Sequence, residues 1–217
     1  MPPLSRPPFT VNPRVHEITR RPAGWFFRFV SDLRITGREH IPAEGRAVIA
    51  ANHLSHIDPP VITIAAPRNV RYLALDELFG QTRIFDWITL YYGAIPMSRT
   101  RAPLGAMREA IATLEDDGLL GVFPEGKRVA AWGAVHPPKR GAAWLAMRTG
   151  SPLIPVAVQG TQGILSVDHP GLARTAIRVW VEPPLLPENY VDRVDPIGAM
   201  MDDWYRAMNR RLEPWHS

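Results

Sequence analysis

The chain of 217 residues contains no cysteine, and only two of its 25 basic residues, Lys127 and Lys139, are lysines. Without cysteine, disulfide bonds, thiolate metal sites and cysteine nucleophiles are excluded, and a reducing compartment suits the chain. The scarcity of lysine leaves arginine as the main cation. Because genomic base composition can produce that bias, it says little about function by itself.

Long apolar runs are also lacking. No stretch of about 18 uncharged apolar residues occurs, which argues against a transmembrane helix. Residues 1–8 contain four prolines and no apolar core, which argues against a secretory signal. We therefore expect residues 1–21 to form an irregular leader, the protein to stay in the cytosol and any contact with a membrane to be peripheral.

The overall composition is that of a folded protein. Hydrophobic residues make up 46% of the chain and charged residues 21%, and the formal net charge is +4. This length and composition predict one domain, residues 22–217, with a core large enough to fold alone. The positive charge favours anionic partners such as a membrane surface, a phosphorylated substrate or nucleic acid.

Apolar runs alternate with helical patterns along the domain. The runs predicted to be strands are residues 46–51, 70–75, 93–97, 119–123, 153–158 and 176–181. The segments predicted to be helices are residues 58–66, 103–117, 141–149 and 200–212. Such alternation predicts an α/β fold, with a single mixed, mostly parallel sheet flanked by helices.

A further amphipathic helix is predicted near the N-terminus, over residues 22–34. The apolar residues at helical spacing are Trp25, Phe26, Phe29, Val30 and Leu33, and arginines flank them. An amphipathic helix with aromatic residues and arginines can lie in a membrane interface. A helix that packs the same face on the core explains the pattern equally well.

His53 and Asp58 form the first candidate pair for chemistry, in the segment NHLSHID (residues 52–58). They are five residues apart, so a turn must bring their side chains together, and a helix start at Asp58 supplies one. A carboxylate bonded to one imidazole nitrogen fixes the tautomer and raises the basicity of the other nitrogen. The pair could therefore act as a general base on a substrate hydroxyl.

Structural roles explain the same residues. Asp58 is followed by two prolines and is a favourable N-cap, with Pro59 at the first helical position. His53 could be a structural loop histidine, and His56 is assigned no role. With no cysteine and no HExxH pattern in the chain, we expect no metal site.

Three further segments follow or form apolar runs: GAIPMSR (residues 93–99), FPEGKR (residues 123–128) and PLIPVAV (residues 152–158). Together with NHLSHID, in this order and at these gaps, they resemble the four sequence blocks of the glycerophospholipid acyltransferase family. The best-known members of that family are 1-acylglycerol-3-phosphate acyltransferases. The blocks lie within residues 47–160, and the segment KRGA (residues 139–142) is similar to a further pattern of the family.

This resemblance implies transfer of a fatty acyl group from an acyl thioester, either acyl-CoA or acyl carrier protein, to a hydroxyl of a lysophospholipid. The expected acceptor is 1-acylglycerol-3-phosphate, which gives phosphatidic acid, and neither a cofactor nor a metal is implied. His53 would deprotonate the acceptor hydroxyl and Asp58 would orient His53. The residues that would bind the acceptor are Arg99, Glu125, Gly126, Lys127, Arg128 and Lys139. The resemblance also implies a peripheral location on the cytoplasmic face of the cell membrane.

Lys127 and Val129 depart from the family pattern, in which small hydroxyl residues are common at both positions. The added charge of Lys127 could indicate another head group, so other lyso- or glycolipid acceptors stay open. A non-catalytic lipid- or nucleic-acid-binding module also stays open, although the arginines are spread along the chain rather than clustered. A third hypothesis is a hydrolase that uses His53 and Asp58 to activate water, since no GxSxG elbow is present.

Overall fold

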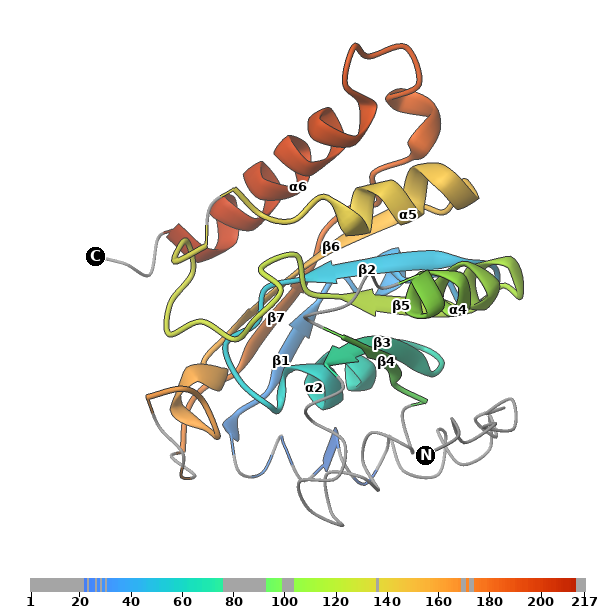
Figure 1. Cartoon of the computed structure of the whole chain (residues 1–217). Coiled ribbons are helices and arrows are strands. Elements are labelled where there is room, and N and C mark those ends of the chain that lie inside the picture. The colour runs from blue at the N-terminus through green and yellow to red at the C-terminus, as the bar shows by residue number, and fades with distance from the viewer. Residues whose placement is uncertain are drawn as a thin grey trace.

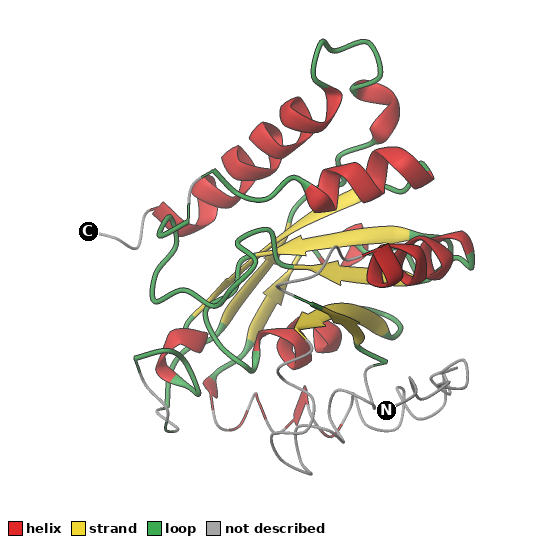
Figure 2. Cartoon of the chain, viewed as in Figure 1, coloured by secondary structure: helices red, strands yellow, loops and turns green. Residues whose placement is uncertain are grey.

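The computed structural model describes residues 22, 24, 25, 27, 29, 31–75, 93–98, 104–135, 137–168, 171 and 174–213. Within this part of the chain, one seven-stranded sheet carries helices on both of its faces (Figure 1 and Figure 2). The predicted leader, residues 1–21, lies outside the described residues. Of the helices in the described ranges, none is long and apolar enough to cross a membrane.

The sheet is mixed and mostly parallel, as predicted. Its strands are β1 (Arg34–Thr36), β2 (Ala47–Ala51), β3 (Val70–Leu75), β4 (Ile95–Met97), β5 (Leu119–Val122), β6 (Leu153–Gln159) and β7 (Arg178–Val181). Their order across the sheet is β1-β7-β6-β2-β5-β3-β4. Neighbouring strands are parallel except β6 and β7, so β1 and β7 run against the other five strands.

The helices cover the sheet unequally. The α-helices are α2 (Asp58–Ala65), α4 (Leu104–Glu115), α5 (Gly141–Thr149) and α6 (Pro196–Leu212), and the 3-10 helices are η1 (Arg38–His40), η3 (Thr161–Gly163) and η4 (Pro187–Asn189). Helix α2 packs on one face of the sheet, and α4, α5 and α6 pack on the other (Figure 1). Parallel strands covered on both faces are buried on both sides, which accounts for their nearly continuous apolar sequences.

Strand β2 connects the two halves of the core. Ile49 and Ala51 belong to the core on the α2 side, whereas Val48 and Ala50 belong to the core under α4, α5 and α6, because successive side chains of a strand point to opposite faces. Trp204 of α6 is completely buried and donates its indole N–H to the carbonyl oxygen of Ala50 at 2.9 Å. Helix α6 is thereby fixed on the strand that leads into NHLSHID.

The N-terminal helix predicted over residues 22–34 is described only in part. Residues 22, 24, 25, 27, 29 and 31 are helical, and the other positions from 23 to 30 lie outside the described residues. The continuous helix therefore stays a prediction. Its predicted end is wrong, because Asp32 takes a left-handed conformation (φ 41°) that stops a helix, and Arg34 begins strand β1.

Helix α6 begins earlier than predicted, at Pro196 instead of residue 200. Asp195 is its N-cap, and the carboxylate of this residue accepts a hydrogen bond from the amide of Gly198 at 2.9 Å. A cap of this kind satisfies an amide that has no partner inside the helix, and the proline at the start needs none. Apolar spacing alone missed this first turn because it depends on the cap.

Candidate functional site

Two of the predicted segments meet at one edge of the sheet. NHLSHID begins directly after β2, and FPEGKR begins directly after β5. These strands are parallel neighbours, with Ala50 opposite Val122. Because parallel strands end at the same edge, the two segments leave the sheet side by side, at the edge where open α/β sheets bind ligands.

His53 and Asp58 are in contact, as the sequence predicted. The Nδ1 atom of His53 lies 2.9 Å from Oδ2 of Asp58, whose side chain is completely buried. The same carboxylate oxygen accepts hydrogen bonds from the amides of Leu54 and Ser55, each at 2.7 Å. Since a carboxylate accepts, the Nδ1 atom donates and neutral His53 keeps a lone pair on Nε2. Such an imidazole can take a proton at Nε2.

The N-cap role predicted for Asp58 is wrong. Helix α2 begins at Asp58 itself, Ile57 is the N-cap, and no side chain caps the helix. The two residues after Asp58 are prolines without an amide hydrogen, and the amide of Val61 donates to the carbonyl oxygen of Ile57 at 3.0 Å. The carboxylate instead turns back toward the preceding loop, where His53 and two amides supply its hydrogen bonds.

FPEGKR and the residue that follows it hold His53 on three sides. The ring of His53 stacks on Phe123, with centroids 4.0 Å apart and planes at 18°. The amide of His53 donates to Oε2 of Glu125 at 2.6 Å, and its carbonyl oxygen accepts from the amide of Val129 at 2.9 Å. With Nδ1 bonded to Asp58, both the main chain and the ring of His53 are fixed in place.

The ring stack continues into the core. Phe123 stacks on Tyr72 of β3, with centroids 5.8 Å apart. Tyr72 passes over Gly121, where an added Cβ atom would lie only 2.2 Å from the tyrosine ring. Glycine at this position of β5 therefore makes room for the column of rings that ends at His53.

Hydrogen bonds tie NHLSHID to β6 and to the segment that follows it. Asn52 is completely buried; its side chain donates to the carbonyl oxygen of Val158 at 2.8 Å and accepts from the amide of the same residue at 2.7 Å. The hydroxyl of Ser55 donates to the carbonyl oxygen of Ile164. The amide of His56 donates to the carbonyl oxygen of Leu165 at 3.3 Å. The loop that carries the candidate base is thus held from both neighbouring strands.

Glu125 is buried, with only 3% of its surface exposed. Its Oε1 atom is buried and has no hydrogen-bond partner among the described residues. Burial raises the pKa of this carboxyl from its ordinary value of 4.5 to about 8; the hydrogen bond from the His53 amide acts in the opposite direction, and the charge of Asp58 adds to the rise. Glu125 is therefore protonated over much of the neutral range.

Lys139 reaches back over the turn after Glu125. Its amide donates to the carbonyl oxygen of Pro124 at 2.7 Å. Gly126 has a φ of 69°, and a Cβ atom added there would lie 2.5 Å from Nζ of Lys139. The left-handed backbone at residue 126 favours glycine, and the missing side chain leaves room for the close approach of the lysine.

The other predicted binding residues differ in what the structure describes. Lys127 is exposed and Arg128 is half-buried. Burial lowers the pKa of Arg128, although the charge of Asp58 opposes that change. Arg99 lies outside the described residues. His56 was assigned no role, and burial, with the charges of Arg128 and His53, lowers its pKa to about 4, so it is neutral at pH 7.

Sequence reasoning missed the residues that immobilise His53. Phe123 lies in FPEGKR, but the sequence predicted no role for its side chain. It predicted none for Asn52 or Val129 either. No spacing rule pairs residues 52 and 158, or 53 and 129, because these contacts depend on how the strands are ordered. Within the described ranges, no group of three or more His, Asp or Glu side chains could hold a metal ion.

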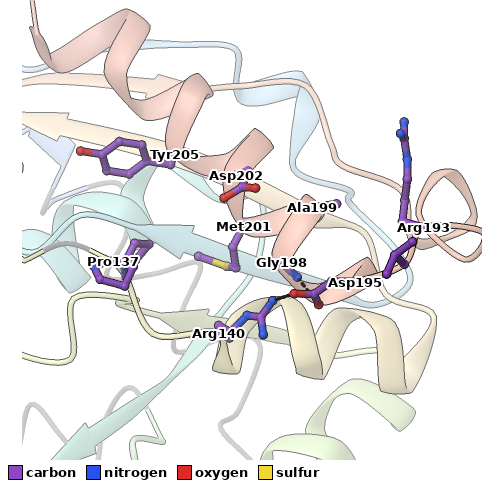
Figure 3. Close-up of a pocket in the computed structure, with 11 residues that line it drawn as sticks. Pro137, Arg140, Arg193, Asp195, Gly198, Ala199, Met201, Asp202 and Tyr205 are labelled. Atoms are coloured by element: carbon purple, nitrogen blue, oxygen red, sulfur yellow. Dashed lines mark hydrogen bonds and ion pairs between the residues drawn. The ribbon is translucent and has the colours of Figure 1, made fainter.

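A pocket lies outside this site. It is a pocket of 640 Å³ between the segment that precedes α5 and the first half of α6 (Figure 3). Its lining residues are Pro137, Pro138, Arg140, Arg193, Val194, Asp195, Gly198, Ala199, Met201, Asp202 and Tyr205. An ion pair between Arg140 and Asp195 crosses it. None of the residues predicted to be catalytic or binding lines this pocket.

Glu125→Gln should stabilise the protein at neutral pH. Glutamine keeps an oxygen for the His53 amide and, unlike glutamate, does not have to take up a proton when the protein folds at neutral pH. Because the folded-state pKa of Glu125 lies above its ordinary value, the wild type should lose about 1.4 kcal/mol of stability per pH unit between about 4.5 and 8, and the variant should not. Urea unfolding at pH 5 and at pH 7.5 measures the difference.

The control for that experiment is Glu188→Gln, which removes an exposed carboxyl from η4. Its stability difference from the wild type should be small and the same at both pH values. A stability difference for Glu125→Gln that does not grow between pH 5 and pH 7.5 would contradict the assignment of a buried, protonated Glu125.

Comparison with known proteins shows the family of this chain. Residues 32–159 match the family model described as Acyltransferase. A 1-acyl-sn-glycerol-3-phosphate acyltransferase of Bacillus subtilis (strain 168) is 30% identical over 131 residues, which cover 59% of this chain and 63% of that protein. A protein of the same name from Limnanthes douglasii is 28% identical over 176 residues, 80% of this chain and 62% of the relative.

The chain thus spans somewhat less than two thirds of the length of these two relatives. Among solved structures, the 1-acyl-sn-glycerophosphate acyltransferase PlsC from Thermotoga maritima has a similar fold, with a TM-score of 0.71. The match covers 91% of this chain and 78% of that chain at 24% sequence identity. Similarity at this level of identity concerns the fold alone.

Proposed function

Because the chain belongs to the Acyltransferase family, which its match over residues 32–159 establishes, we propose that it transfers a fatty acyl group from an acyl thioester to the hydroxyl of a lysophospholipid. The acceptor that we propose is 1-acylglycerol-3-phosphate, in keeping with the names of its relatives. The donor would be acyl-CoA or acyl carrier protein, and we propose neither a metal nor a cofactor.

The observation that carries this proposal is the immobilised imidazole of His53. Its Nδ1 atom is bonded to Asp58, its ring stacks on Phe123, and 18% of its side chain is exposed. Its Nε2 atom has no hydrogen-bond partner among the described residues. A fixed, partly exposed imidazole with a free nitrogen is what general-base catalysis requires.

The proposed reaction proceeds without an acyl-enzyme. Nε2 of His53 takes the proton of the acceptor hydroxyl as the oxygen attacks the thioester carbonyl. The new C–O bond forms, the C–S bond breaks, and the thiolate leaves with the proton that His53 carries. Asp58 accepts the Nδ1–H of the imidazolium and stabilises it, and hydrogen bonds from two amides hold the carboxylate in place.

The cations around Gly126 support a phosphate-bearing acceptor. Lys139 lies against the turn, Lys127 is exposed on it, and Arg128 follows. All three are on or beside FPEGKR, which also holds His53. A phosphate held by these cations would place the glycerol portion of the same molecule near Nε2 of His53. We propose that Arg99 contributes to the same site.

His53→Ala should abolish acyl transfer. Removal of a general base costs a factor of about 10² to 10⁴ in kcat/KM, because the hydroxyl must then lose its proton to water. The assay follows thiol release and product formation by chromatography, with a radiolabelled acyl thioester and a panel of lysophospholipid, glycerol phosphate and glycolipid acceptors. His40→Gln is the matched control, because His40 contacts Val181 and not this site.

Wild-type protein that transfers nothing to any acceptor would refute the proposed function, and a fully active His53→Ala would remove His53 from the mechanism. Free fatty acid as the product, instead of an acylated acceptor, would establish the hydrolase. Circular dichroism confirms that each variant keeps its fold.

Lys127→Ala and Lys139→Ala should raise KM for a phosphate-bearing acceptor about tenfold each, with a much smaller change for an uncharged monoacylglycerol. A contact of a charged donor with phosphate contributes about 1.5 kcal/mol or more, and 1.4 kcal/mol is a factor of ten. Arg148→Ala, which removes an exposed cation from the last turn of α5, should leave both KM values unchanged. Equal effects on both acceptors would contradict a phosphate site.

We also propose that the protein works at a membrane surface through its N-terminal segment. Trp25 is 76% exposed and Phe29 is 75% exposed, and their rings stack with centroids 6.4 Å apart. Adjacent exposed aromatic side chains supply the apolar contact that an interfacial helix makes with lipid, and the +4 charge of the chain favours anionic head groups. The cytoplasmic face of the cell membrane is the location we propose.

Replacement of Trp25 and Phe29 by serine should reduce binding to vesicles of mixed neutral and anionic phospholipids at least tenfold, since two apolar contacts with lipid are lost. Vesicle sedimentation measures the bound fraction. Leu104→Ser, which removes a side chain 65% exposed on α4, is the matched control and should bind as the wild type does. Undiminished binding by the double variant would exclude this segment as the contact.

A further inference from the structure

The family resemblance places Glu125 among the residues that bind the acceptor, but its surroundings point to another role. Only 3% of its surface is exposed. One carboxyl oxygen is used by the amide of His53 at 2.6 Å, and the other is buried away from solvent. A hydroxyl or phosphate of a bound substrate could reach neither oxygen without first displacing the candidate base or opening the core.

We propose that Glu125 is a positioning residue, which fixes the main chain of His53 and does not touch the acceptor. This inference rests on the proposed function, in which His53 is the base. Within that function it divides FPEGKR into two parts: the phenylalanine and the glutamate hold the base, whereas the glycine and the cations that follow hold the substrate.

The geometry around His53 shows what the contact contributes. The amide and the carbonyl oxygen of His53 form hydrogen bonds with two residues of one loop, Glu125 and Val129. Phe123, from the same segment, lies against the imidazole. Loss of the Glu125 contact leaves the amide of a partly buried residue without an acceptor and allows the main chain to move. A displacement of 1 Å can cost about 100-fold in rate.

The proton on Glu125 matters for the same reason. Burial, and to a lesser extent the charge of Asp58, raises the pKa of Glu125 to about 8. A neutral Glu125 accepts the His53 amide without placing a second negative charge beside Asp58. The base is then held by one ionised carboxylate at its ring and by one uncharged carboxyl at its main chain, so that Asp58 alone pairs with the imidazolium.

The test compares Glu125→Gln and Glu125→Ala with the wild type in the acyl transfer assay. Glutamine keeps an oxygen acceptor in the neutral form that the site favours, so its kcat should stay within about threefold of the wild type. Alanine removes the acceptor, and kcat should fall about 100-fold. KM for the phosphate-bearing acceptor should stay within about twofold in both variants. A glutamate that binds the acceptor would instead raise KM in both.

A second measurement does not need activity. The ¹H NMR signal of the His53 amide should lie far downfield in the wild type, because its hydrogen bond is only 2.6 Å long. The signal should stay downfield in Glu125→Gln and move upfield by about 1 ppm or more in Glu125→Ala, if Glu125 holds this amide.

The two measurements separate the possible failures. An amide signal that does not change in Glu125→Ala would overturn the positioning role, even if kcat falls. An increase in KM for the acceptor with kcat unchanged would also overturn it and would restore Glu125 to the binding site. If wild-type protein transfers no acyl group, the proposed function fails, and the NMR result still decides whether Glu125 fixes His53.

Discussion

One oxygen of the Asp58 carboxylate organises the candidate site. It accepts hydrogen bonds from Nδ1 of His53 and from the amides of Leu54 and Ser55. These bonds fold the loop back on the start of α2 and set the tautomer of the imidazole in the same step. A completely buried carboxylate needs such partners, since an unpaired charge in the interior is very costly. The contact that makes the loop stable is therefore also the one that prepares the base.

The second constraint comes from the sheet. Strands β2 and β5 are parallel neighbours, so the loops after them meet at one edge. FPEGKR then supplies a ring and a carboxyl that hold His53, and Val129, the next residue, supplies an amide. This arrangement buries Glu125 and raises the pKa of its carboxyl to about 8, which lowers the stability of the folded protein at neutral pH. Such a cost to stability is characteristic of groups that are kept for function.

Much of the architecture followed from local patterns. Strand β3 spans residues 70–75 and α5 spans residues 141–149, as predicted from apolar runs and helical spacing. These signals are reliable because a parallel sheet covered on both faces requires continuous apolar strands. The predictions were wrong where local signals conflicted or were absent. The N-terminal segment gives way to β1 at Arg34, where a strand forms only because β7 lies beside it.

The sequence by itself determined which chemical groups this protein has: an imidazole and a carboxylate five residues apart, two prolines directly after the carboxylate, and cations after FPEG. It also determined the family, because the order and spacing of motifs are properties of the chain. Only the tertiary structure decided that Glu125 is buried against His53, that Phe123 supports the ring and that Asn52 joins two strands. Those contacts link residues about 70 to 106 positions apart, and strand order, which no local pattern encodes, is what brings them together.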